Sequence, residues 1–139
     1  MTRDRFKLIH SELIQQVQCI EYDLKLIYAA MHKGDFEKNF ETLSKANLGK
    51  IARELRELDH SDNFPELSDE DYKVIDEIRI IRNYWCHQCY LDFVYIQDNY
   101  QREIKFQEIA QRLHYDENRT YALMQKMEQI RVMIVKQYR

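Results

Sequence analysis

The sequence predicts an all-α protein, an antiparallel bundle of four main helices with one or two short helices beside them. Its 139 residues include only 2 glycines and 1 proline, so the residues that build hairpin and sandwich turns are scarce. Apolar residues recur three and four positions apart over long stretches, which is the spacing of one helix face. A hydrophobic content of 45% is enough to bury one core, so we expect a single domain over residues 1–139.

Local signals divide the chain into helices and loops. Gly34 follows the first apolar repeat as a helix-ending residue, and Ser68 is an N-cap ahead of three acidic residues. His10 stands within the first apolar stripe, where we expect a packed side chain rather than a ligand. The expected elements are a helix over 3–33, a short helix near 36–43, a helix over 47–58, a loop over 60–67, a long helix over 69–97, a shorter helix after 98–99, an interruption at 114–118, and a last helix to the C-terminus.

The helix over 69–97 has two different faces. At about 100° per residue, one broad arc is apolar and reads as a core face. The members of that arc are Val74, Ile78, Ile81, Tyr84, Trp85, Leu91, Tyr95 and Ile96. The opposite arc is polar at its rim, and its members are Arg79, Arg82, Asn83, Cys86, His87 and Tyr90. Such a mixture suits a partner surface better than open water.

Three residues of the polar arc are candidates for chemistry. Asn83 and His87 are four residues apart and within reach of each other, so the amide is expected to orient the imidazole. A histidine titrates near neutral pH and suits general acid–base catalysis, whereas the planar, permanently charged fork of Arg82 suits a phosphate. Arg82 and His87 lie about 140° apart around the helix, so only a bent-over arginine side chain brings both to one ligand.

The pattern Arg82-Asn83-x-x-x-His87, on a long helix of an all-α domain, resembles the signature of the HEPN superfamily. Tyr90, three residues after the histidine, fits the aromatic residue that many members have there. The resemblance implies a homodimer formed through the helix over 69–97, with arginine and histidine from both subunits lining a cleft that cleaves RNA without metal.

On that resemblance, Arg82 and His87 would be catalytic, Asn83 would orient them, and Tyr90 and Arg79 would lie nearby in supporting roles. The products would be a 2′,3′-cyclic phosphate and a 5′-hydroxyl. The expected function is that of a toxin or phage-defence endoribonuclease, with RNA as substrate and an antitoxin protein as a candidate partner.

Two other functions stay open. In one, the same polar residues form a structural network in a non-catalytic dimeric adaptor or nucleotide-binding module. In the other, residues 106–124 form a helix-turn-helix of a small DNA-binding regulator. That segment has few cations and no glycine in its turn, so a plain helical pair is the preferred interpretation.

Cys86 and Cys89 flank His87 without completing a metal site. A structural zinc site needs four ligands, and no second cluster of cysteine and histidine has suitable spacing. We therefore expect no metal and no cofactor. Cys19, Cys86 and Cys89 are instead predicted to be small buried hydrophobic residues.

Charge and cysteine usage limit the partners and the compartment. A net charge of −3 and a pI near 6.0 exclude a polycation that would coat nucleic acid, so any RNA contact must be a local patch. The sequence has an odd number of cysteines, no signal-peptide pattern and no apolar run of about 18 residues. We expect a cytoplasmic protein with no membrane contact.

Overall fold

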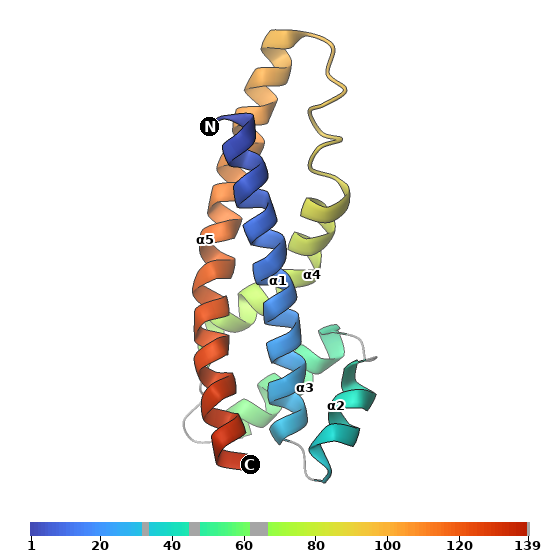
Figure 1. Cartoon of the computed structure of the whole chain (residues 1–139), viewed down its shortest axis with the longest axis vertical. Coiled ribbons are helices and arrows are strands. Elements are labelled where there is room, and N and C mark those ends of the chain that lie inside the picture. The colour runs from blue at the N-terminus through green and yellow to red at the C-terminus, as the bar shows by residue number, and fades with distance from the viewer. Residues whose placement is uncertain (32–33, 45–47, 62–66, 139) are drawn as a thin grey trace.

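The computed structural model describes residues 1–31, 34–44, 48–61 and 67–138, and these form five helices (Figure 1). The helices are α1 (Arg3–Met31), α2 (Phe36–Ser44), α3 (Leu48–Ser61), α4 (Asp69–His87) and α5 (Asn99–Tyr138). No strand occurs within these ranges, so the predicted all-α class is confirmed. None of the helices among the described residues has the length and apolar content needed to span a bilayer.

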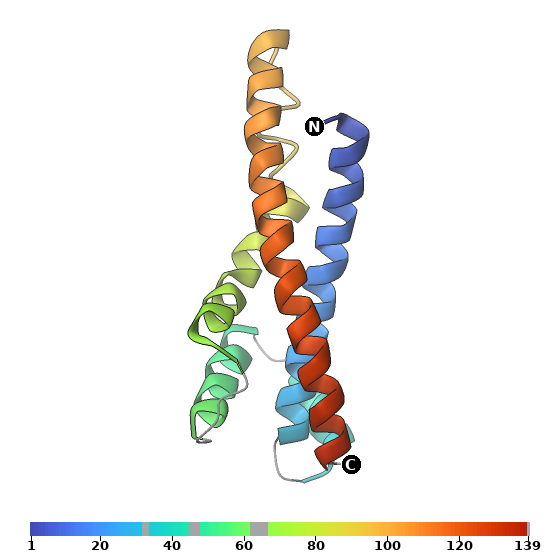
Figure 2. The ribbon, with the colours of Figure 1, turned by 90° about the vertical axis from the view of Figure 1, so that its left-hand side faces the viewer.

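The two longest helices, α1 and α5, lie side by side and run in the same direction (Figures 1 and 2). Gln16 of α1 hydrogen-bonds Glu117 of α5, and Asp23 pairs with Arg131, so both contacts join residues about one hundred positions apart. Because the difference in residue number between contacting residues stays nearly the same along the two helices, α1 and α5 are parallel. The predicted antiparallel arrangement is therefore wrong for α1 and α5. It is correct for α4, which is antiparallel to both of these helices.

Helix α4 ends at His87, ten residues before the predicted end at position 97. The carbonyl oxygen of Trp85 accepts a hydrogen bond from His10 Nε2 of α1 at 2.6 Å, and the amide of Cys89 turns instead to the carbonyl of Tyr84. The regular backbone hydrogen bonds of α4 therefore end where α1 binds the Trp85 carbonyl that would otherwise accept the next one. His10 is thus a packed residue, as predicted, and it also binds the end of α4.

Residues 88–98 leave α4 in a series of turns and lead to the start of α5, at the end of the molecule where α1 also begins (Figure 1). This route is what makes α5 parallel to α1. Cys89 and Phe93 are buried, whereas Leu91 and Tyr95 are 53% and 77% exposed. The prediction that Leu91 and Tyr95 extend the core face is wrong, because that prediction assumed a helix through 97.

Helix α5 is continuous, so the predicted interruption at 114–118 is wrong. The preferred plain helical pair and the alternative helix-turn-helix over 106–124 are wrong for the same reason. Polar residues within and just after the predicted interruption make buried contacts with other helices. Asp116 accepts a hydrogen bond from Trp85 Nε1 at 2.9 Å, and Thr120 donates to Gln16 at 2.6 Å. Because no glycine or proline occurs between 99 and 138, nothing local ends the helix.

The first three helices begin and end close to the predictions. Gly34 has a φ of 111°, the left-handed conformation that favours glycine after a helix. The predicted end of the first helix at position 33 lies outside the described residues, as does most of the predicted loop over 60–67. Helix α3 continues to Ser61, three residues beyond its predicted end.

Helix α4 begins where its cap residue predicts. Ser68 accepts a hydrogen bond from the backbone of Asp71, and the Asp71 carboxylate accepts one from the backbone of Ser68. Asp71 also pairs with Lys126 of α5. One carboxylate therefore stabilises the helix start and holds α4 against α5.

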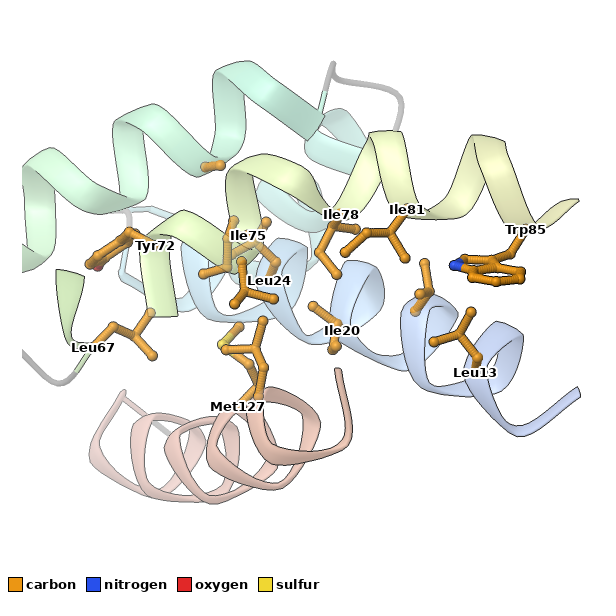
Figure 3. Close-up of a cluster of buried hydrophobic side chains, with 14 of the residues drawn as sticks. Leu13, Ile20, Leu24, Leu67, Tyr72, Ile75, Ile78, Ile81, Trp85 and Met127 are labelled. Carbon is orange, nitrogen blue, oxygen red and sulfur yellow. The ribbon is translucent and has the colours of Figure 1, made fainter. Parts of the chain in front are cut away.

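The core lies between α1, α4 and α5 (Figure 3). Most of its members come from the apolar repeats of these helices, α3 adds Ile51, Ala52 and Leu55, and the segments between helices add Leu67, Cys89 and Phe93. Trp85 is its largest buried side chain, at 1% exposed. Figure 3 labels Leu13, Ile20, Leu24, Leu67, Tyr72, Ile75, Ile78, Ile81, Trp85 and Met127 among them.

Replacing Trp85 by phenylalanine is expected to lower the free energy of unfolding by about 2–3 kcal/mol. The variant loses the indole N–H that Asp116 accepts and leaves space beside the smaller ring. Urea unfolding followed by circular dichroism measures the change. Tyr95→Phe, at an exposed position of the 88–98 segment, is the control, and an equal effect of the two substitutions would contradict the packing described here.

Acid should weaken the start of α4. Burial raises the pKa of Asp71, but hydrogen bonds from Lys126 and Ser68 outweigh burial and lower it below its ordinary value of 3.8. The folded chain therefore holds this proton less tightly than the unfolded chain, and the stabilisation, complete above 3.8, is lost as pH falls through the lower folded value. The difference in unfolding free energy between wild type and Asp71→Asn, measured by urea unfolding at each pH, should shrink in that window, and a difference that stays constant would contradict this role of Asp71.

Candidate functional site

The outer face of α4 is not covered by the rest of the described chain. Six residues at helical spacing are exposed along it: Asp76, Arg79, Ile80, Asn83, Cys86 and His87. We call these six residues the outer stripe. Ile80, in the middle of the outer stripe, is 62% exposed, so the stripe combines polar groups with an apolar side chain. The burial of Cys86 that we predicted is wrong, because the residue lies on this outward side.

Arg82 lies at the border between the outer stripe and the face that packs on α1. Its Nη1 donates to both carboxylate oxygens of Glu21, at 2.9 and 3.0 Å. The side chains of Arg82 and Glu21 are 36% and 17% exposed, so water screens the pair in part. An ion pair of this kind contributes about 1 kcal/mol or less to stability.

His87 ends α4 with its imidazole exposed. Within the described part of the chain, neither His87 nor Asn83 has a side-chain hydrogen bond or ion pair, and none joins the two to each other. The predicted orientation of His87 by Asn83 is therefore not formed here, although their four-residue spacing keeps them neighbours on the helix surface.

One chain keeps the two predicted catalytic groups apart. Arg82 points to Glu21 of α1, whereas His87 is five residues further along, about 140° around the helix and about 7.5 Å along its axis. The Arg82 guanidinium and the His87 imidazole are on the same helix, but in this conformation they do not face the same ligand. With Arg82 bound to Glu21, the two groups of one chain do not face a common phosphate.

Tyr90 packs on α1 and not along the outer stripe. Its ring makes edge contacts with Phe6 and His10, with ring centres 5.8 and 5.5 Å apart, and burial raises the pKa of its hydroxyl. Tyr90 therefore helps to hold the 88–98 segment against α1. Its predicted place beside the histidine assumed that the helix continued to 97.

Arg79 borders a shallow hollow between α3 and α4. The hollow, of about 140 Å³, is lined by Gly49, Ala52, Ile75, Asp76, Arg79 and Ile80. Arg79 has no hydrogen bond or ion pair with another described residue. Its guanidinium, three residues from that of Arg82, is close enough on the helix surface to add positive charge at this border.

The two cysteines beside His87 are in different environments. Cys86 is exposed, whereas Cys89 is buried, donates to the carbonyl oxygen of Trp85, and has its pKa raised to about 11 by burial. Among the described residues no three side chains of histidine, cysteine, aspartate or glutamate are grouped to hold a metal ion.

Glu21 is the site residue that sequence reasoning missed. It stands next to the buried Ile20 and one helical turn from the buried Leu24, so it lies at the edge of the apolar stripe of α1. An acidic residue at that edge is a signal for a partner on a neighbouring helix. The sequence contains many other acidic residues, so pairing this one with Arg82 required the tertiary structure.

No protein-family model, no curated protein and no solved structure matches this chain.

Proposed function

We propose that the protein is a metal-independent endoribonuclease of the HEPN type, acting as a toxin or phage-defence component at a site formed between two copies of the chain. The observation that carries this proposal is the exposed, unpartnered imidazole of His87 on the outer stripe, with Arg82 at the border of the stripe. The arginine–polar–x-x-x–histidine pattern of α4 supports it.

The chemistry is a transesterification within the RNA strand. The His87 imidazole acts as a general acid–base group that helps to remove the proton from a ribose 2′-hydroxyl. The oxygen then attacks the adjacent phosphorus, and Arg82 stabilises the charge that develops on the phosphate oxygens. The 5′-oxygen leaves and takes up a proton, which gives a 2′,3′-cyclic phosphate and a 5′-hydroxyl end.

Two copies are proposed because one chain separates the two groups. An α4–α4 contact across the outer stripe brings the histidine of one copy towards the arginine of the other. The exposed side chain of Ile80 gives this contact an apolar centre, and Asn83 lies between Ile80 and His87 in the same stripe.

With single-stranded RNA and excess chelator, the purified protein is expected to cleave, and His87→Ala is expected to lower the rate about 100-fold or more, because general acid–base catalysis contributes on the order of 10²–10⁴-fold. Arg82→Ala should lower it to a similar degree by removing charge stabilisation from the phosphate. Gel analysis of end-labelled RNA measures the rate and identifies the cyclic phosphate.

The control is His114→Ala, which removes an exposed histidine from α5 and should leave cleavage unchanged. Growth on expression gives a second readout, since wild type should be toxic and both α4 variants harmless. Cleavage that survives His87→Ala, or its complete absence in the purified dimer, would exclude the nuclease.

A non-catalytic dimeric adaptor or nucleotide-binding module is the second candidate, and the Arg82–Glu21 pair favours it. A guanidinium held by a carboxylate within its own chain serves as a structural link between α1 and α4. In this role the arginine contacts no substrate.

If the protein is an adaptor, substitution of Arg82 should reduce stability and self-association, with no cleavage activity to lose. Arg82→Ala would lower the unfolding free energy by about 1 kcal/mol, because Glu21 loses its partner. The variant would also weaken self-association, measured by light scattering, and no RNA would be cut by wild type. An Arg82→Ala protein with unchanged stability and unchanged association would contradict the adaptor.

A further inference from the structure

The pair between Arg82 and Glu21 uses only one nitrogen of the guanidinium. Nη1 donates to both carboxylate oxygens, at 2.9 and 3.0 Å. A guanidinium has five N–H donors, and the three on Nε and Nη2 have no partner in the described structure. Neither of these nitrogens is among the fully buried polar atoms that lack a partner in the described structure, and the Arg82 side chain is 36% exposed.

The free edge is the one that suits a phosphate. The N–H groups of Nε and Nη2 point the same way and can donate to two oxygens of one phosphate group. A carboxylate bound to that edge would block it. Glu21 instead binds at Nη1, which leaves the edge open while the positive charge stays in place.

The Glu21 side chain is largely shielded from solvent. Glu21 lies in the interior of the 29-residue helix α1, between the buried Ile20 and Asp23, and its side chain is only 17% exposed. A shielded carboxylate of this kind restricts the arginine that binds it. The guanidinium therefore loses less rotamer entropy when a ligand arrives.

We propose that Glu21 is a positioning residue, which holds Arg82 by Nη1 so that its Nε and Nη2 edge stays open and oriented for a phosphate of single-stranded RNA. This inference rests on the proposed function for its ligand. It assigns to α1 a role in binding RNA at the border of the outer stripe of α4.

The chain offers a matched control for a merely structural role. Asp23, two residues along α1, pairs with Arg131 of α5 at 3.0 Å. Both pairs join a carboxylate of α1 to an arginine on another helix, and Asp23 is the more buried, at 4% exposed. Asp23→Asn therefore tests what the loss of such a pair does to the fold without touching Arg82.

The test measures binding separately from cleavage. A short 2′-O-methyl oligoribonucleotide, which lacks the attacking hydroxyl, is titrated into the full chain labelled with ¹⁵N-arginine. The Nε–H signal of Arg82, assigned by its loss in Arg82→Ala, should shift as the oligonucleotide binds. Glu21→Gln should weaken the affinity about fivefold, because the arginine must then be ordered on binding. Asp23→Asn should leave the affinity unchanged at a temperature where all variants are folded.

Several results would overturn the proposal. One is binding of the oligonucleotide with no change in the Arg82 signal, and another is a loss of affinity in Asp23→Asn equal to that in Glu21→Gln. Tighter binding by Glu21→Gln would mean that the carboxylate competes with the phosphate. In the Arg82→Ala background, a further loss from Glu21→Gln would show that Glu21 acts through another residue. Binding that depends on Glu21, in a protein that cuts no unmodified RNA, would reject the nuclease and leave the positioning role standing.

Discussion

The indole of Trp85 is the contact on which the arrangement of the helices depends. Its ring is buried where α1, α4 and α5 meet, and its N–H donates to Asp116 of α5. The carbonyl oxygen of the same residue accepts a hydrogen bond from His10 of α1. One residue therefore joins α4 to both long helices and also marks where α4 stops. Cys86 and His87 follow directly, so their exposure is a consequence of how Trp85 is packed.

This anchoring gives α4 an inner face that is buried against the neighbouring helices and an outer face that nothing in the described chain covers. Arg82 lies between them, with its Nη1 bound to Glu21 and its other nitrogens without a partner in the described structure. The nuclease and adaptor proposals differ in how they interpret this one side chain. In the nuclease, the open edge of the guanidinium would bind the phosphate. In the adaptor, the edge bound to Glu21 would link α1 to α4. The two interpretations can be separated by experiment because they use different nitrogens of the guanidinium.

The candidate site could be predicted from the sequence only in part. Helical spacing was sufficient to group Asn83 and His87 on one face, because residues four apart on a helix are always neighbours. Helical spacing could not predict the contact between Glu21 and Arg82, because the two residues are 61 positions apart and meet only where α1 and α4 pack together. Tyr90 was misplaced for a related reason, since its position depends on where α4 ends.

Sequence alone determined the helical class, the starts of α1 and α4, and the apolar faces that pack into the core. These follow from local rules: scarce glycine and proline, a serine cap with acidic residues after it, and apolar residues at helical spacing. Tertiary structure alone decided that α4 ends at His87, that Asp116 and Thr120 of α5 find buried partners on α4 and α1, and that α1 and α5 are parallel. In each case a polar group of one helix is satisfied by another helix, and such a partner is distant in sequence and leaves no local pattern to read.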